Sequence, residues 1–182
     1  MIFIPEIEGS VAIRSGAEKF LNAFRQRVRG GFLLGRPHSR SNYVVSETSP
    51  DRLQVRAADW QTAINVGLNR IELRQLEPGS IHYQVRYWQW ARFVLGLSGT
   101  VGLVGLVLLL GFDVRAYLVQ HQSSMIPGFS IEQNLMIGWL TVLFWGFIWP
   151  WILISLHKRP LHRLIACLVA EVDAKAASTS PS

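Results

Sequence analysis

The stretch Gly35–Ser41, GRPHSRS, gathers the residue types best suited to hold an anion. Arg36, His38 and Arg40 stand at alternate positions, with serines beside them. Guanidinium and imidazolium groups donate charge-assisted hydrogen bonds to phosphate oxygens, so this stretch could receive a phosphate or a lipid headgroup. A flexible polar loop is the competing interpretation, and we favour it because the stretch has no further pattern.

Other reactive side chains are scattered rather than spaced for catalysis. No phosphate loop, HExxH, GxSxG or CxxC pattern occurs in the sequence. His82 falls on a strand face that we expect to be solvated. His157 and His162 are five residues apart, which places them on different sides of a helix. The single cysteine, Cys167, excludes a disulfide within one chain. We therefore expect no metal site, no cofactor and, on balance, no enzymatic activity.

Two long uncharged runs dominate the rest of the chain. Phe93–Phe112 and Asn134–Leu156 contain no Asp, Glu, Lys, Arg or His. Runs of this length match the roughly 30 Å hydrocarbon thickness of a bilayer. A buried core helix would explain either run alone, but two in so short a chain favour membrane spans over about 92–112 and 134–156, joined by a loop at 113–133. Spans without ionisable residues argue against a pump or transporter.

The distribution of basic residues predicts how the spans are oriented. The loop at 113–133 carries only Arg115, whereas five basic residues flank the outer ends of the spans. Positive-inside bias therefore places both termini in the cytoplasm, with a bacterial cytoplasmic membrane as the expected location. Amphipathic rings and basic side chains prefer the membrane interface. The expected interface residues are Tyr87, Trp88, Trp90, Arg92, Trp149, Trp151, Lys158 and Arg159.

Small residues in the two runs predict a helix-packing face. Lipid gives little hydrophobic drive between helices, so close backbone approach over small side chains supplies the packing. The candidates are Gly96, Ser98, Gly99, Gly102, Gly105, Gly138 and Gly146. Their partner could be the other run or a second copy of the chain, and the short loop favours an intramolecular hairpin. Pro150 removes a backbone hydrogen bond and predicts a kink.

Residues 1–91 have the pattern of an α+β domain. Apolar residues at helical spacing predict a helix after Ser15, whose capping box would pair Ser15 with Glu18. Period-two alternation and short turns then predict an antiparallel meander of about five strands, which the helix covers on one face. The predicted strands are Asn42–Thr48, Leu53–Ala57, Trp60–Val66, Arg70–Leu76 and Ile81–Tyr87, with a weak one at Gly31–Leu34.

Residues 157–182 predict a short amphipathic helix that starts at Pro160. Leu161, Leu164, Ile165, Leu168 and Val172 form its apolar stripe. The helix could lie on the bilayer or dock on the first domain, and its basic start and acidic end favour docking. The last eight residues are rich in Ala, Ser and Pro and predict a disordered tail.

These features leave two main functional hypotheses. The first is a non-enzymatic two-span membrane protein whose cytoplasmic domain, held against the membrane, scaffolds or recruits a partner. The second is a membrane-tethered module that binds a ligand or lipid, and a membrane-bound enzyme comes third. Residues 1–91 hold 12 Lys/Arg and 8 Asp/Glu. Anionic inner-leaflet headgroups suffice as partners for this charge, and a homo-oligomer or a membrane-protein partner is open. The sequence has no dense basic stripe of the kind that would indicate nucleic-acid binding.

Overall fold

The computed structural model describes residues 4–29, 43–49, 51–120, 126 and 128–178, without the side chains of Glu47 and Thr48. The chain divides into two compact units. The first comprises residues 1–91 together with 156–182, and the second comprises residues 92–155. The C-terminal segment therefore belongs to the same unit as the N-terminal domain.

The first unit contains an antiparallel sheet of five strands in the order β1-β5-β4-β3-β2, so the α+β prediction is confirmed. The register aligns apolar residues across the sheet. Ile7 lies opposite Val85, Val85 opposite Ile71, and Ile71 opposite Val55. The strands are β1 (Glu6–Ala12), β2 (Tyr43–Ser49), β3 (Arg52–Ala57), β4 (Arg70–Glu77) and β5 (Ser80–Arg86).

The predicted set of strands needs two corrections. Trp60–Val66, expected as a strand, is the helix α2. Asp59 caps its start by accepting a hydrogen bond of 2.7 Å from the Thr62 N–H, and Gly67 ends it with φ of 72°. The edge strand β1 was not predicted, although Glu6 and Glu8 alternate with the buried Ile7. The weak strand predicted at Gly31–Leu34 lies outside the described residues.

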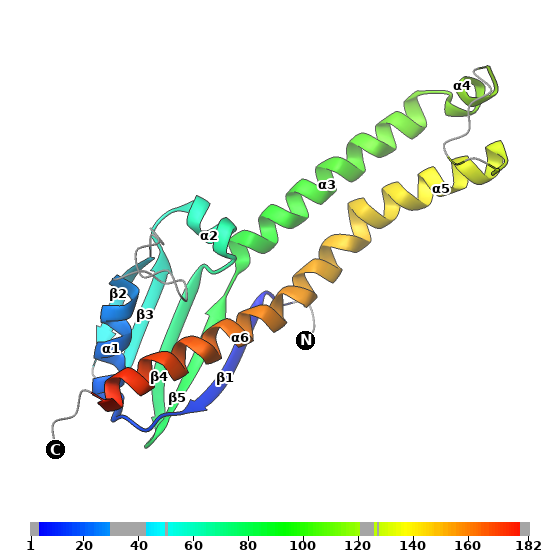
Figure 1. Cartoon of the computed structure of the whole chain (residues 1–182). Coiled ribbons are helices and arrows are strands. Elements are labelled where there is room, and N and C mark those ends of the chain that lie inside the picture. The colour runs from blue at the N-terminus through cyan, green and yellow to red at the C-terminus, as the bar shows by residue number, and fades with distance from the viewer. Residues whose placement is uncertain (1–3, 30–42, 50, 121–125, 127, 179–182) are drawn as a thin grey trace. The chain divides into compact units, whose positions relative to one another are not determined.

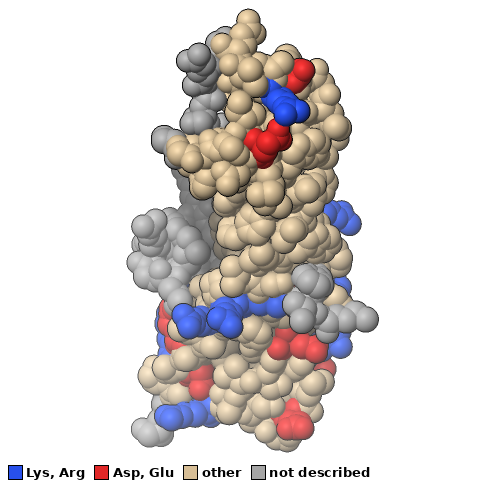
Figure 2. Space-filling model, turned by 90° about the vertical axis from the view of Figure 1, so that its right-hand side faces the viewer, with Lys and Arg blue, Asp and Glu red and all other residues tan. Residues whose placement is uncertain are grey.

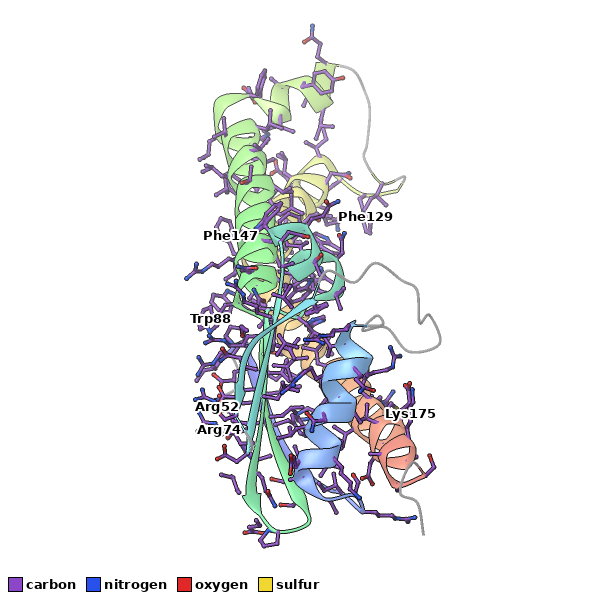
Figure 3. All side chains as sticks on the ribbon, turned by 90° about the vertical axis from the view of Figure 1, so that its left-hand side faces the viewer. Arg52, Arg74, Trp88, Phe129, Phe147 and Lys175 are labelled. Atoms are coloured by element: carbon purple, nitrogen blue, oxygen red, sulfur yellow. The ribbon has the colours of Figure 1, made fainter. Side chains whose placement is uncertain are left out.

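Two helices cover the apolar face of the sheet. α1 (Ala17–Arg29) packs against β2 and β3, and the 156–178 part of α6 (Trp149–Ser178) lies beside it on the same face (Figures 1 and 3). Each fully buried large side chain in this layer contributes about 1.5–3 kcal/mol. The layer includes Phe20, Phe24, Leu53, Leu73, Ile81, Ile165 and Leu168, all completely buried.

The N-terminus of α1 also differs from its prediction. The Phe20 N–H donates to the Gly16 carbonyl, and α1 begins at Ala17, so Gly16 rather than Ser15 stands at the cap. The Ser15 hydroxyl instead donates to Asp173 on α6. The Ser15 hydroxyl therefore bonds to a side chain that is distant in sequence, instead of forming the capping box that the local pattern predicts.

The C-terminal helix is longer than predicted at both ends. α6 begins at Trp149 and runs through Pro160 to Ser178, so Pro160 does not start it and part of the predicted tail is helical. Because Pro160 has no N–H, the helix lacks the hydrogen bond to the Leu156 carbonyl. Of the predicted stripe, Leu161, Ile165, Leu168 and Val172 are buried, which agrees with docking on the first domain. Leu164 is half-buried and lines a groove with Arg163 and Cys167 instead.

The second unit is a helical hairpin. α3 (Trp88–Gly111) runs antiparallel to a helical stretch of three segments, since Gly102 contacts Gly146, Gly105 contacts Val142, and Leu109 lies near Gly138. That stretch comprises α5 (Ile131–Leu143), the π-helical segment η1 (Phe144–Ile148) and the start of α6. The connection contains α4 (Val114–Gln120), where only a loop was expected. Ser130 and Gln133 form a capping box that begins α5 three residues before Asn134.

The helix changes its hydrogen-bond pattern just before Pro150. Within η1, the Trp149 N–H donates to the Phe144 carbonyl five residues earlier. Pro150 cannot donate to the carbonyl four residues before it, and a π turn shifts the local pairing at that point. A π-helical segment therefore stands just before Pro150, the residue at which the sequence predicts a kink.

The long helices present most of their apolar side chains to the outside. Trp88–Gly111 and the continuous Ile131–Ser178 are long and apolar enough to cross a membrane by length and composition. Only 6% and 17% of their most apolar windows are buried, whereas a core helix of a soluble protein would be mostly covered. Figure 2 shows a broad surface over these helices with few charged residues.

The glycines on α3 differ in what surrounds them. A Cβ added at Gly102 would lie 2.7 Å from the Gly146 Cα, whereas Gly96 and Gly99 have no neighbouring atom within 4 Å. Ser98 is half-buried on the same helix. Gly102 and Gly146 thus allow close backbone approach within the hairpin, while Gly96 and Gly99 face open space.

We predict that Gly102→Leu separates the two helices and Gly99→Leu does not. Overpacking typically costs about 1–3 kcal/mol. A disulfide between Gly105→Cys and Val142→Cys, introduced in a Cys167→Ser background, reports the separation. We expect its yield to fall sharply with Gly102→Leu and to be retained with Gly99→Leu. An equal yield in both variants would contradict the packing of Gly102 on Gly146.

Candidate functional site

The sequence predicts a candidate anion site in the basic stretch Gly35–Ser41. Arg36, His38 and Arg40 all lie outside the described residues. Of the other predicted residues, Arg92, Trp149, Trp151 and the small packing residues lie in the second unit. The polar and charged groups considered next fall on the contact between α6 and the sheet, on the open face of the sheet, and on the outer face of α6. All three locations belong to the first unit.

The predicted interface aromatics of the first unit form a cluster with a histidine. The Trp90 ring stacks on the His157 ring with centroids 3.9 Å apart and an angle of 13°, and Tyr87 meets both rings edge-on. The His157 Nε2 lies 3.3 Å from the Gly67 carbonyl, to which it donates. Burial lowers the pKa of His157, and the hydrogen bond to Gly67 partly offsets this. Burial also raises the pKa of Tyr87 to about 12.

The other predicted interface residues are more exposed. Trp88 is 46% exposed and Trp151 is 42% exposed. Trp149 is half-buried and packs against Trp145 with ring centroids 4.9 Å apart. Arg92 and Arg159 are exposed, and Lys158 is half-buried.

A second histidine of α6 bonds to the middle of the sheet. The Tyr83 hydroxyl and the His162 Nδ1 are 2.9 Å apart. Tyr83 passes close over Gly9 of β1, where an added Cβ would lie 2.6 Å from the hydroxyl oxygen. Gly9 therefore gives this tyrosine the space it needs. His157 and His162 both contact the sheet unit, each through different partners.

A carboxylate fastens the far end of α6. Asp173 accepts hydrogen bonds from the Arg14 N–H at 3.0 Å, the Ser15 N–H at 2.9 Å and the Ser15 hydroxyl at 2.6 Å. Burial alone would raise the pKa of Asp173, but the Ser15 and Arg14 hydrogen bonds and the Arg14 charge outweigh it. The pKa therefore lies below its ordinary value of 3.8. Nearby, Arg27 and Glu171 form a surface ion pair of 2.8 Å.

These groups are engaged in structure rather than poised for chemistry. Among the described residues, no three His, Cys, Asp or Glu side chains gather to hold a metal ion. A cavity of about 60 Å³ lies between α1 and α6, lined in part by Arg27, Val172 and Lys175. Ligand pockets usually measure about 300–1,000 Å³, so this cavity holds no more than small solvent molecules.

The opposite face of the sheet is open and rich in arginine. No described helix covers it, and Arg52 and Arg74 project from it on the side away from α1 and α6, whereas Lys175 lies on the helix side (Figure 3). Arg56 lies opposite Arg70, and Arg70 lies opposite Arg86, so three like charges form one row across β3, β4 and β5. Like charges directly opposite each other destabilise a sheet.

Carboxylates offset only part of this charge. Glu72 pairs with Arg52 at 3.3 Å and with Arg74, and Glu6 lies 3.6 Å from Arg86. Arg70 donates to the Gln54 side chain at 3.1 Å. The alternating pattern by itself predicts only a solvated face. The signal that this prediction missed is the set of arginines on the polar side of three successive strands: Arg52 and Arg56, Arg70 and Arg74, and Arg86.

No known protein family, curated protein or solved structure matches this chain.

We predict that Asp173→Ala destabilises the first unit by about 2–3 kcal/mol, because three buried donors lose their acceptor. Hydrogen exchange of the α1 and β5 segments in the detergent-solubilised chain measures the loss. Glu171→Ala, two residues away, should cost less than about 1 kcal/mol, because it removes only a surface ion pair. Equal protection in the two variants would contradict the role of Asp173.

The same carboxylate predicts a pH dependence. Its pKa is lowered in the folded chain, so its contribution is present above pH 3.8 and is lost as the pH falls below that value. As the pH falls below 3.8, the free energy of unfolding should therefore decrease less in Asp173→Ala than in the parent protein.

Proposed function

We propose that the chain is a non-enzymatic, two-span integral membrane protein whose first unit recruits or stabilises a protein partner at the membrane surface. The observation that carries the membrane location is the exposure of the long apolar helices. Leu103, Val107 and Leu110 are 60%, 60% and 73% exposed, and no other part of the described chain covers them. Bilayer lipid is the solvent that suits such surfaces.

The distribution of charge supports an orientation with both termini in the cytoplasm. The described part of the connection between the spans carries Arg115, which pairs with Glu132 at 2.6 Å. The basic residues at the opposite ends of the spans include Lys158, Arg159 and Arg163, for which the positive-inside rule favours the cytoplasmic side.

The open face of the sheet supports a partner-binding role. Retaining Arg56, Arg70 and Arg86 in one row costs stability, and binding an acidic segment would remove that repulsion. The row lies at the end of the sheet where β5 leads through Tyr87 into α3. We assign the face to an acidic segment of a protein partner.

The filled core gives little support to a module that encloses a ligand. Phe20, Leu73 and Ile81 are completely buried between sheet and helices, and the cavity of about 60 Å³ is too small for a lipid tail. Lipid binding on the outside of the unit remains compatible with this core.

We predict the topology with thiol labelling in a Cys167→Ser background. In intact bacterial cells, Gln120→Cys should react with an impermeant maleimide, and Asn22→Cys should react only after permeabilisation. The reverse pattern would overturn the proposed orientation. Recovery of the chain in the soluble fraction would overturn the membrane location.

A photo-crosslinking amino acid tests the partner surface. We expect benzoylphenylalanine at Arg56 to form an adduct with an Asp- or Glu-rich segment of a protein, and the same residue at Asn22 on α1 to form none. Arg70→Glu with Arg86→Glu should lower the adduct yield by about fivefold or more, because repulsion replaces attraction. Arg29→Glu is the matched control. Equal yields in both variants would contradict the assignment.

A further inference from the structure

The outer face of α6 carries an open groove that the docking of this helix does not use. The groove measures about 590 Å³ and belongs wholly to the first unit. Its lining residues are Leu156, Arg159, Pro160, Arg163, Leu164 and Cys167. They follow one another at intervals of three, one, three, one and three residues, which is the spacing of a single stripe along a helix.

This stripe lies on the side of the helix opposite the docked face. Leu161, Ile165 and Val172 are buried on the docked face. At 100° per residue, the centres of the two stripes are about 150° apart. Leu156 is 51% exposed and Cys167 is exposed, so apolar groups remain on the outside after docking. These apolar groups on the outer side of the helix would be stabilised by a second apolar surface or by lipid.

The two arginines of the groove differ from four other arginines of the first unit, which are held by ion pairs. Arg27, Arg52, Arg74 and Arg86 each pair with a carboxylate. Within the described part of the chain, no carboxylate pairs with Arg159 or Arg163. They stand one turn apart, so both guanidinium groups can reach one anion.

The chemistry of the groove is that of a lipid interface. Two guanidinium groups can donate hydrogen bonds to the oxygens of one phosphate, and the apolar walls can contact the glycerol backbone and the first acyl carbons. The groove starts at Leu156, the last residue of the uncharged run Asn134–Leu156, and continues along the same helix. That continuity places the arginines where a spanning helix leaves the hydrocarbon.

We propose that Arg159 and Arg163 form a binding site for the phosphate headgroup of an anionic phospholipid, with Leu156, Pro160 and Leu164 contacting its apolar part. The proposal rests on the membrane location proposed above. It adds to that location a defined lipid site on α6 and a dependence on headgroup charge.

The single cysteine of the chain reports occupancy of the groove directly. The full chain is reconstituted in nanodiscs of phosphatidylcholine alone or with increasing phosphatidylglycerol, and the rate of Cys167 maleimide modification is measured. We expect phosphatidylglycerol to slow the modification in a saturable manner. A basic residue near an anionic surface contributes about fivefold to affinity, so Arg159→Gln with Arg163→Gln should shift the midpoint by roughly 30-fold.

Matched variants and soluble anions separate the outcomes. Lys19→Gln with Arg29→Gln removes two exposed basic residues of α1 and should leave the midpoint unchanged. Inorganic phosphate added to phosphatidylcholine discs should give no protection. Protection by phosphate alone, equal protection in pure phosphatidylcholine, or the same midpoint in both double variants would each overturn the lipid site.

The membrane location and the lipid site fail in different ways. A chain that does not enter discs of either composition would overturn the membrane location and the site with it. A chain that enters both compositions with Cys167 equally reactive would overturn the lipid site alone. Hydrogen exchange of α1 and β5 in the Arg159/Arg163 double variant should match the parent chain, which excludes unfolding as the cause of any change.

Discussion

The first unit depends on covering one apolar sheet face with two helices from opposite ends of the chain. α1 has 13 residues and so spans roughly 20 Å, and it packs on β2 and β3. The docked part of α6 covers the rest of the face. Hydrogen bonds hold it there: His157 bonds to Gly67, His162 to Tyr83, and Asp173 to the Arg14 and Ser15 backbone. Without α6, a wide apolar surface would face water. The first unit can therefore finish folding only after the intervening hairpin has been synthesised.

The hairpin follows a different packing rule from the first unit. In the sheet unit, large side chains such as Phe20 and Leu73 fill the space between layers. In the hairpin, the helices come close together at Gly102 and Gly146, where neither residue has a side chain. Large apolar side chains instead point outward. This inversion suits a surrounding apolar solvent, in which burying large side chains between helices brings little gain.

Two surfaces of the first unit remain unused by its own folding. One is the open sheet face with the Arg56, Arg70 and Arg86 row, and the other is the outer stripe of α6 with Arg159 and Arg163. Inside the described part of this unit, Asp173 and both α6 histidines make structural contacts, and the cavity between α1 and α6 measures about 60 Å³. The surfaces are therefore where we assign function: one to a protein and one to lipid.

Sequence periodicity alone determined the α1 face, the strands β3, β4 and β5, the docked stripe of α6 and the two long apolar helices, because each is set by spacing within one segment. Tertiary structure decided what depends on distant partners. Trp60–Val66 is a different case, because its residues are strand-like but the neighbouring Asp59 cap and Gly67 turn, both local signals, make it a helix. β1 needs β5, whose Arg86 lies opposite Glu6, and the Ser15 hydroxyl goes to Asp173 rather than to its own helix. Which arginines stay unpaired also follows from the fold, because the strand register and the docking of α6 decide which carboxylates come within reach.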